Sequence, residues 1–142
     1  PNILTRMDQL SAADVVFLRK YGEEEAFGIR FSHGRTCLIL RAENGELATV
    51  CWYGPMGSRD EREAGIIDHC FTRHDYRGTG LYPQALRYIA STTASGQNGV
   101  PFPKLYIECS AFNYSSAAGI RKAGFVPSES TLTVCGRTLF KW

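Results

Sequence analysis

Residues 76–82 read Tyr76-Arg77-Gly78-Thr79-Gly80-Leu81-Tyr82. The apolar run over residues 66–72 predicts a strand before them, and residues 83–90 predict a helix after them. A strand, a glycine-rich turn and a helix in this order can bind an anion. Glycines let backbone N–H groups approach a ligand closely, and the start of a helix leaves N–H donors unpaired. We therefore expect the turn to hold a phosphate or pyrophosphate.

Two familiar glycine motifs are excluded. The chain lacks the G-x-x-x-x-G-K-[ST] spacing of nucleotide-binding P-loops. A dinucleotide fingerprint would need a third glycine where Pro83 stands. An ordinary strand–helix turn that binds nothing is the competing interpretation, because most such turns have no ligand.

Residues 104–125 supply a second pattern: an apolar strand over 104–110, a turn at Asn113, a short helix, and the ending Lys122-Ala123-Gly124-Phe125. Together the two segments resemble the GNAT superfamily of acyl-CoA-dependent N-acyltransferases. In that family an Arg-x-x-Gly-x-Gly/Ala loop holds the CoA pyrophosphate. An Asn-x-x-(Ala/Ser) turn opens a helix that ends in Lys-x-Gly-Phe. The resemblance covers about residues 36–126.

The resemblance implies which residues bind the CoA thioester. Backbone atoms at the end of the strand before the loop would hold pantetheine and the thioester, the loop itself the pyrophosphate, and the Asn turn would complete the site. The implied binding residues are Phe71, Thr72, Arg77, Gly78, Thr79, Gly80, Leu81, Tyr82, Asn113 and Ser116. Two positions depart from the family. Tyr82 replaces the last small residue of the loop, and Ile120 stands where many relatives place a tyrosine that protonates the leaving thiolate.

The same resemblance implies a single domain over residues 1–142 with an α/β fold, in which a central mixed sheet carries helices on both faces. It implies an N-acyltransferase (EC 2.3.1 type) that moves acetyl from acetyl-CoA, as co-substrate, directly to the primary amine of a small molecule. Leu81-Tyr82-Pro83 and Ser116 resemble bacterial members that acylate amino sugars or other small amines. A non-catalytic module that binds acyl-CoA is the alternative, and an acyl-homoserine or amino-acyl transferase is a third.

Glu108 is the predicted general base. Strand alternation places it on the face opposite Ile107, and a Glu in a largely apolar strand is unusual. In GNATs that acylate amines, a Glu five residues before the motif Asn often takes the amine proton, and Glu108 is five residues before Asn113. A solvent-facing or ion-paired Glu is the competing interpretation. Asp68 and His69 are the second choices for the base.

Three tyrosines are candidates for the general acid: Tyr82, Tyr114 and Tyr76. A mechanism without a protein acid is also open, because a thiolate is a tolerable leaving group. Trp52 and Tyr53 either line the acceptor pocket or pack in the core, and packing is the favoured interpretation.

The composition fits a single soluble globular domain, with 44% hydrophobic and 21% charged residues. Sixteen basic and fourteen acidic side chains give a charge of +2, and no basic run suggests nucleic acid. No apolar run reaches the ~18 residues of a membrane span, and no signal peptide is evident. We therefore expect a cytoplasmic protein without nucleic-acid or membrane partners, and a homodimer is left open.

The cysteines and histidines suggest no metal site. The five cysteines are odd in number and lack C-x-x-C spacing, so we expect reduced thiols that pack as small hydrophobes. A disulfide or a catalytic thiol is the less favoured alternative. His69, Cys70 and His74 are close in sequence but form no zinc pattern.

The remaining pattern predicts the order β-α-α-β-β-β-α-β-α-β-β. Asn44-Gly45 between two apolar runs predicts a hairpin. About thirty residues separate the strands at 66–72 and 104–110, enough for a helical crossover and hence parallel pairing. The other expected elements are strands at 3–7, 35–42, 46–53, 132–134 and 138–141, a helix capped by Asp8 or Ser11 that continues to about Lys20, a helix at 23–31, a loop at 54–65 and a connector at 91–103.

Overall fold

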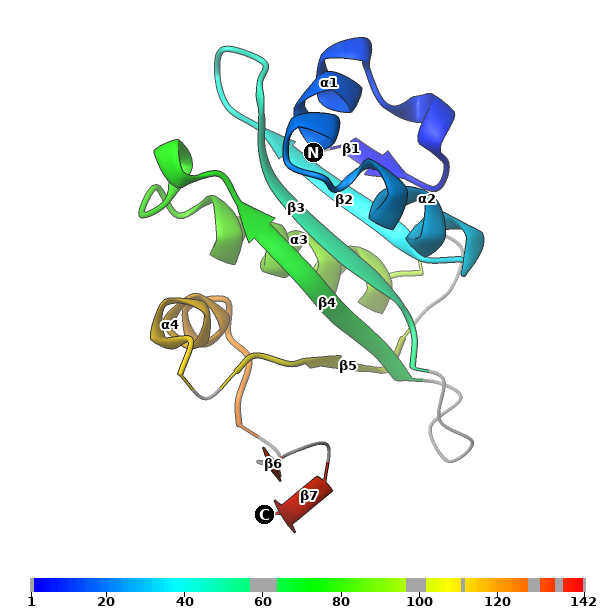
Figure 1. Ribbon diagram of the computed structural model, residues 1–142. Helices are drawn as coiled ribbons and strands as arrows, with labels where there is room; N and C mark the ends of the chain where they lie inside the picture. The colour runs from blue at the N-terminus through cyan, green and yellow to red at the C-terminus, as the bar shows by residue number, and fades with distance from the viewer. Residues whose placement is uncertain are drawn as a thin grey trace.

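The structure is a computed structural model that describes residues 2–56, 64–96, 102–110, 112–127, 131–134 and 137–141. Its elements follow the predicted order, with two added 3-10 helices (Figure 1). They are β1 Asn2–Leu4, η1 Met7–Gln9, α1 Ala12–Lys20, α2 Glu24–Ser32, β2 Thr36–Arg41, β3 Leu47–Pro55, β4 Ala64–Thr72, η2 His74–Tyr76, α3 Leu81–Ala94, β5 Lys104–Ile107, α4 Tyr114–Lys122, β6 Thr131–Val134 and β7 Arg137–Lys141.

Five strands form the main sheet in the order β1-β2-β3-β4-β5. The pairs β1–β2, β2–β3 and β3–β4 are antiparallel, and β4–β5 is parallel, so the predicted mixed sheet is confirmed. The predicted hairpin is also confirmed: Gly45 has φ 82°, and β2 and β3 pair on either side of it. β6 and β7 form a separate antiparallel pair, while Cys135 lies outside the described residues.

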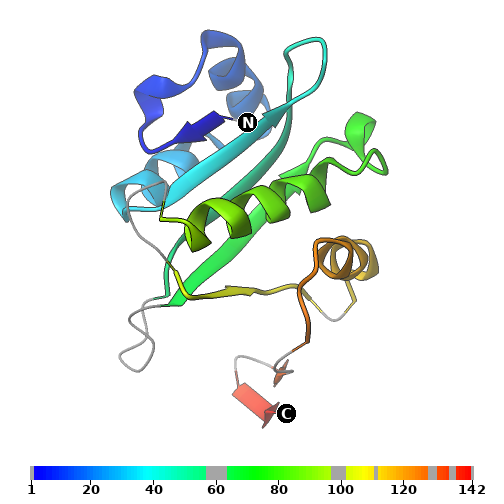
Figure 2. The same ribbon diagram turned by 180° about the vertical axis from the view of Figure 1, so that it is seen from behind.

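Helices cover both faces of the main sheet, as predicted (Figures 1 and 2). Alternation along β2 sends Cys37 and Ile39 to one face and Leu38 and Leu40 to the other. The first face packs against α1 and α2, through Leu18 and Phe27 among others, and the second face packs against α3, through Ala85, Leu86 and Ile89. Two separate apolar layers therefore hold the sheet between the helices.

Trp52 and Tyr53 belong to these layers. The Trp52 side chain is buried, and its ring centroid lies 4.8 Å from those of Phe27 and Phe31 in edge-to-face geometry. Tyr53, on the other face, is equally buried beside the α3 layer. The packing interpretation of these two aromatics is thus confirmed.

A capping box begins α1 and is tied to the sheet. Ser11 Oγ accepts a hydrogen bond from Asp14 N at 3.2 Å, and Asp14 Oδ2 accepts one from Ser11 N at 3.1 Å. The Asp14 side chain, 2% exposed, also receives both Nη atoms of Arg41 at 2.9 and 2.6 Å. This ion pair holds the start of α1 against the end of β2.

The connector predicted at 91–103 is wrong at its beginning, because α3 continues to Ala94. The hydroxyl groups of Thr92 and Thr93 donate to the carbonyl groups of Tyr88 and Ile89 at 2.9 and 2.7 Å. Such bonds satisfy a buried hydroxyl within a helix, so the run of Ser and Thr does not end it. The longer α3 crosses one face of the sheet against β2 and β3, in front of the strands in Figure 2.

The strand predicted at 104–110 is too long. β5 ends at Ile107, and residues 108–110 are exposed and outside the sheet. The reason is tertiary, because β4 turns away from β5 at this point. In the described parts of the chain, no helix is both long and apolar enough to cross a membrane.

Candidate functional site

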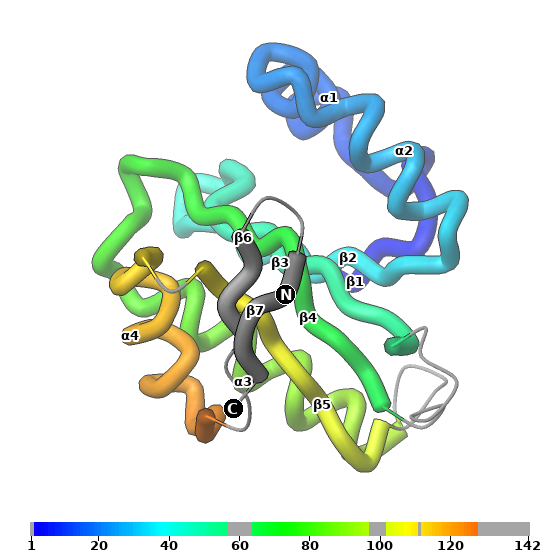
Figure 3. Tube along the Cα trace, turned by 60° about the horizontal axis from the view of Figure 1, so that its bottom comes forward, coloured from blue at the N-terminus to red at the C-terminus, as the bar shows by residue number. Residues whose placement is uncertain are grey.

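β4 and β5 separate at the end of the sheet that carries the glycine-rich turn. They pair in register from Ala64 with Lys104 to Ile67 with Ile107, and no further. β4 continues to Thr72 and stays paired with β3 on its other side. Figures 1 and 3 show the two strands diverging toward α4. Residues 68–72 of β4 therefore have one backbone edge without a β5 partner.

A β-bulge marks the point of separation. Trp52 pairs with Asp68 and Val50 with Phe71, so two residues of β4, His69 and Cys70, lie opposite one residue of β3. His69 has φ 45°, an uncommon conformation for a residue with a Cβ. A bulge bends its strand and increases its twist. The bulge thus accounts for the departure of β4 from β5.

The predicted anion-binding turn follows η2 and leads directly into α3. Gly78 and Gly80 have φ 78° and 85°, which other residues adopt only with strain. Gly80 is the N-cap of α3 and offers no capping side chain, so the first N–H groups of α3 remain open to a ligand. Thr79 Oγ1 donates to Tyr76 O at 2.6 Å, and Arg77 Nε donates to Thr72 O at 3.1 Å. These two side chains stabilise the turn.

The start of α4 lies across from this turn. Asn113 caps the helix, because its side-chain oxygen accepts a hydrogen bond from Ser116 N at 3.1 Å. Tyr82 reaches over from α3, and its hydroxyl lies 3.1 Å from Ser116 Oγ. The Tyr82 ring covers Gly119, at which an added Cβ would meet the ring at 2.6 Å.

A pocket of about 540 Å³ lies between these elements. It brings together every residue predicted to bind the cofactor except Thr79. Its lining is Cys70, Phe71, Thr72, Tyr76, Arg77, Gly78, Gly80, Leu81, Tyr82, Pro83, Asn113, Ser115, Ser116, Ala118, Gly119 and Lys122. Sequence reasoning missed four α4 residues in this set: Ser115, Ala118, Gly119 and Lys122. They are three or four residues apart and so share one face of α4, and this spacing could have predicted them from the sequence.

Glu108, the predicted base, does not line the pocket. It follows the last residue of β5 and is exposed, so its predicted place within that strand is wrong. Asp68, a second choice, is ion-paired with Arg35, whose side chain is 14% exposed. His69 is 59% exposed, and its Nδ1 lies 3.3 Å from Asp68 Oδ1. Like Glu108, neither Asp68 nor His69 is in the pocket lining, although the next residue of β4, Cys70, is.

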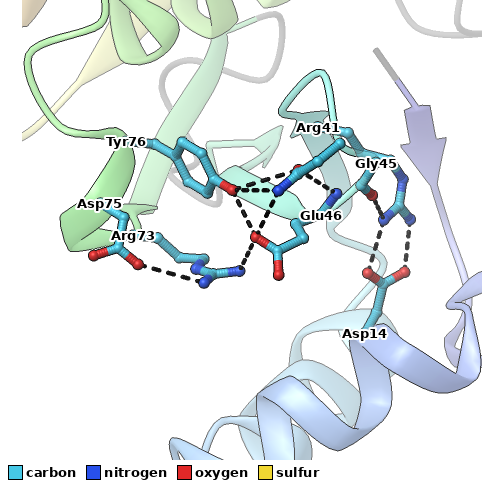
Figure 4. Close-up of polar contacts among 8 residues, drawn as sticks. Asp14, Arg41, Gly45, Glu46, Arg73, Asp75 and Tyr76 are labelled. Carbon is cyan, nitrogen blue, oxygen red and sulfur yellow. Dashed lines mark hydrogen bonds and ion pairs between the residues drawn. The ribbon is translucent and has the colours of Figure 1, made fainter.

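The three candidate tyrosines have different surroundings. Tyr114 is 74% exposed and lies outside the pocket lining. Tyr76 borders the pocket, but its hydroxyl donates to Glu46 Oε2 at 2.6 Å, a bond that raises the tyrosine pKa (Figure 4). Tyr82 is half-buried in the pocket wall, and burial raises its pKa well above the ordinary value. The phenol of Tyr82 therefore stays protonated at neutral pH.

Arg73 connects the η2 turn to the β2–β3 hairpin and to α1. Its guanidinium pairs with Glu46 at 3.3 Å and with Asp75 at 3.5 Å (Figure 4). The same group lies 4.9 Å from the ring centroid of Phe17 and 5.3 Å from that of Tyr76. These contacts hold the segment before the glycine turn at a fixed place.

The cysteines with described positions differ in their exposure. Cys37 and Cys51 are buried, Cys70 is partly buried, Cys109 is exposed, and all four are free thiols. The exposure of Cys109 differs from the expected burial because it lies beyond the end of β5. Among the residues with described positions, no three His, Cys, Asp or Glu side chains gather as a metal site would require.

No family model matches the chain, and no curated protein matches it. Solved structures do match. A ribosomal-protein-alanine N-acetyltransferase from Brucella melitensis biovar Abortus 2308 is 15% identical, with a TM-score of 0.69 over 94% of this chain and 96% of that one. The aminoglycoside 6′-N-acetyltransferase of Acinetobacter baumannii is 16% identical, with a TM-score of 0.66 over 94% and 95%.

A third match is glucosamine-6-phosphate N-acetyltransferase from Arabidopsis thaliana. It is 18% identical, with a TM-score of 0.52 over 87% of this chain and 79% of that one. At these identities the likeness concerns the fold. The five-stranded mixed sheet and its four α-helices have the GNAT acetyltransferase fold, as the two sequence motifs predicted.

Proposed function

We propose that the protein is an acyl-CoA-dependent N-acyltransferase that transfers acetyl from acetyl-CoA directly to the primary amine of a small molecule. The observation that carries the proposal is the pocket. It joins an anion-binding helix start, a strand edge without a partner strand and a protonated phenol in one cavity of about 540 Å³. A phosphorylated thioester needs these three features together.

The turn from Arg77 to Tyr82 would bind the CoA pyrophosphate. The open N–H groups at the start of α3 point to the loop side, and the helix dipole adds positive potential there. Gly78 and Gly80 keep side chains away from the phosphates. The contribution of Arg77 is to hold the turn through Thr72 O as well as to supply charge.

The edge of β4 over Phe71 and Thr72 would hold pantetheine and the thioester. Both residues line the pocket where β5 has ended, so their backbone can bind an extended ligand as a further strand would. Asn113 and Ser116 close the cavity from α4. The thioester carbonyl would then meet fixed N–H donors that stabilise the oxyanion formed during transfer.

Tyr82 would donate a hydrogen bond to the departing sulfur. It is the candidate tyrosine whose hydroxyl lies within the pocket wall, beside Ser116. Its raised pKa keeps the donor proton in place, so the phenol stabilises the thiolate without having to give up that proton. This role would take the place of a tyrosine at position 120, where this chain has isoleucine.

The proposed acceptor is a small amine such as an amino sugar. Among the matched structures, one is an aminoglycoside 6′-N-acetyltransferase and one a glucosamine-6-phosphate N-acetyltransferase. A ribosomal-protein-alanine N-acetyltransferase is also among them, so a protein N-terminus is the competing acceptor. The two classes differ in size and are separated by direct assay.

The test has two stages. Calorimetry with CoA and acetyl-CoA measures binding, and release of free thiol from acetyl-CoA measures transfer to amino sugars, polyamines, amino acids and peptides beginning with alanine. We expect binding, and thiol release with a small amine. No binding at millimolar concentration would refute the proposal. Binding without transfer to any amine would instead support a non-catalytic acyl-CoA module, the alternative that Ile120 favours.

A further inference from the structure

Three titratable residues directly follow the last paired residues of β4 and β5. The last register pair of the two strands is Ile67 with Ile107. Asp68 and His69 come next on β4, and Glu108 comes next on the chain after β5. The following residue of β4, Cys70, already lines the pocket. A proton acceptor at this point would stand next to the proposed thioester site.

His69 is held there by the backbone. It is the one non-glycine residue with positive φ among the described ranges, at 45°. A side chain in this conformation is strained, and the surrounding sheet must maintain it. The β3 register on both sides of the bulge does so. The bulge therefore changes the alternation of side chains along β4 at the point where β4 and β5 separate.

Asp68 connects His69 to a partly buried cation, Arg35. Arg35 Nη2 bonds Asp68 Oδ2 and also lies 3.4 Å from the carbonyl oxygen of Ile66, while Arg35 Nη1 lies 3.4 Å from that of Pro55. Asp68 is thereby fixed by one oxygen. Its other oxygen, Oδ1, is buried and accepts no hydrogen bond, while His69 Nδ1 lies 3.3 Å away without the alignment of one.

A small rotation of the imidazole would supply the missing donor. With Nδ1–H facing Asp68 Oδ1, the neutral ring carries its lone pair on Nε2. Hydrogen bonds of catalytic groups are often poorly aligned before substrate binds and tighten afterwards. The His69 side chain is 59% exposed, so an acceptor can reach Nε2 from solvent.

We infer that His69 is the general base of the transfer, oriented by Asp68, which Arg35 fixes in turn. This inference rests on the proposed acyltransferase function. His69 Nε2 takes one proton from the attacking nitrogen, whose lone pair forms the C–N bond with the thioester carbonyl carbon. The C–S bond breaks, and its electron pair leaves with sulfur. The imidazolium releases its proton to water, the sulfur takes one from water, and amide and free thiol result.

Glu108 is the competing base, and the two assignments predict opposite results. Glu108 lies on an exposed segment beyond β5, whereas His69 is fixed by a bulge and faces a carboxylate that is itself fixed. Orientation matters because proton transfer requires the base within hydrogen-bond distance of the proton. We therefore expect turnover to depend on His69 and to tolerate loss of Glu108.

The test compares His69→Asn, Glu108→Gln and His74→Asn at saturating acetyl-CoA. Asparagine tolerates positive φ, so His69→Asn removes the base with little added strain. His74 is the matched control, because it also neighbours an aspartate, 3.9 Å from Asp75, and is 89% exposed. We expect kcat to fall about 10²–10⁴-fold in His69→Asn and to stay near the wild-type value in the other two variants. Calorimetry should show unchanged acetyl-CoA affinity in His69→Asn.

His69→Gly keeps the inference testable if the asparagine variant folds poorly, because glycine accepts φ 45° and leaves space for free imidazole. Added imidazole should restore part of its turnover. For Asp68, as the positioning residue, Asp68→Asn should lower kcat and leave the KM for acetyl-CoA unchanged.

Two results would overturn the inference. Near-normal kcat in His69→Asn, or a large loss in Glu108→Gln alone, would assign the base elsewhere and leave the acyltransferase function standing. A wild-type protein that transfers acetyl to no amine would refute both the base and the function, so thiol release by the wild type in the same assay tells the two failures apart.

Discussion

The ring of Tyr82 lies directly against the backbone of Gly119, so closely that a Cβ at Gly119 would approach Tyr82 Cδ1 to 2.6 Å. This contact joins α3 to α4 at the floor of the pocket. The Tyr82 hydroxyl is placed by the same contact, 3.1 Å from Ser116 Oγ one turn earlier on α4. The large Tyr82 ring therefore fits against α4 because Gly119 has no side chain.

Gly119→Ala should destabilise the protein, although alanine is the better helix former. The added methyl group would force the ring aside, and such overpacking costs about 1–3 kcal/mol. The matched control is Gly28→Ala in α2, where no atom lies within 4 Å of the added Cβ. That variant should gain about 0.5–1 kcal/mol. Urea unfolding of both variants measures the difference, and equal shifts would refute the fitted contact.

Tyr82→Phe should lower kcat by about 10–100-fold, because a hydrogen bond to a charged group contributes roughly 1.5–3 kcal/mol. Acetyl-CoA binding should change little. Because burial raises the Tyr82 pKa above its ordinary value of ~10, the phenol remains a donor and no loss of rate up to pH 9 should trace to it. Tyr114→Phe, on an exposed side chain, is the control. Unchanged turnover in Tyr82→Phe would leave the sulfur without a protein donor.

Gly80→Ala should weaken CoA binding more than its effect on stability explains. At φ 85° the new Cβ strains the turn by about 1–2 kcal/mol, and it also stands beside the proposed phosphate position. Gly22→Ala has similar strain, at φ 70°, after α1 and outside the pocket lining. Calorimetry should show weaker binding for Gly80→Ala only. Equal affinity in the two variants would remove the turn from the CoA site.

The buried thiols should resist alkylation. Burial raises the Cys37 pKa, while a hydrogen bond with Cys70 and then burial raise that of Cys51, so both stay protonated at pH 8. Cys109 is exposed and should react first with iodoacetamide, as peptide mass mapping can show. Cys70→Ala should retain turnover, because the proposed transfer is direct. An acyl-cysteine formed and consumed at the catalytic rate would contradict that mechanism.

Asp14 should contribute acid-sensitive stability. Burial alone would raise its pKa, but hydrogen bonds from Arg41 and Ser11 outweigh burial and lower it. A lowered folded-state pKa adds stability that is complete above the unfolded value of ~3.9 and is lost as pH falls through the folded value. Asp14→Asn should lose up to about 3 kcal/mol at neutral pH, the lower end for a broken buried pair, since Arg41 is partly exposed.

Urea unfolding between pH 7 and pH 3 measures this effect. The free energy of unfolding of the wild type should exceed that of Asp14→Asn by less as the pH falls toward 3. Glu24→Gln is the surface control, because the Arg19–Glu24 pair is largely solvated and should change stability little. If the difference in free energy of unfolding between wild type and Asp14→Asn stays constant from pH 7 to pH 3, the carboxylate charge is not what stabilises α1.

The sequence by itself determined the local elements and their order. Gly78 and Gly80 marked the turn into α3, Asn113 marked the cap of α4, and Asn44-Gly45 marked the hairpin, because each depends on backbone conformation within a few residues. The length between the strands at 66–72 and 104–110 was enough to predict parallel pairing. These motifs therefore predicted the fold and the predicted cofactor-binding residues that line the pocket, all but Thr79, while the α4 residues Ser115, Ala118, Gly119 and Lys122 were missed.

Only the tertiary structure decided the arrangement at the point where β4 and β5 separate. The alternating pattern extends past Ile107, but β5 ends there because β4 bends away at the bulge of His69 and Cys70. A bulge arises from the pairing of two strands, so the sequence of either strand alone does not predict it. In the same way, Tyr82 packs against Gly119. A glycine has no side chain that would mark it as a site residue in the sequence, and Gly119 joins the site only because α3 packs on α4.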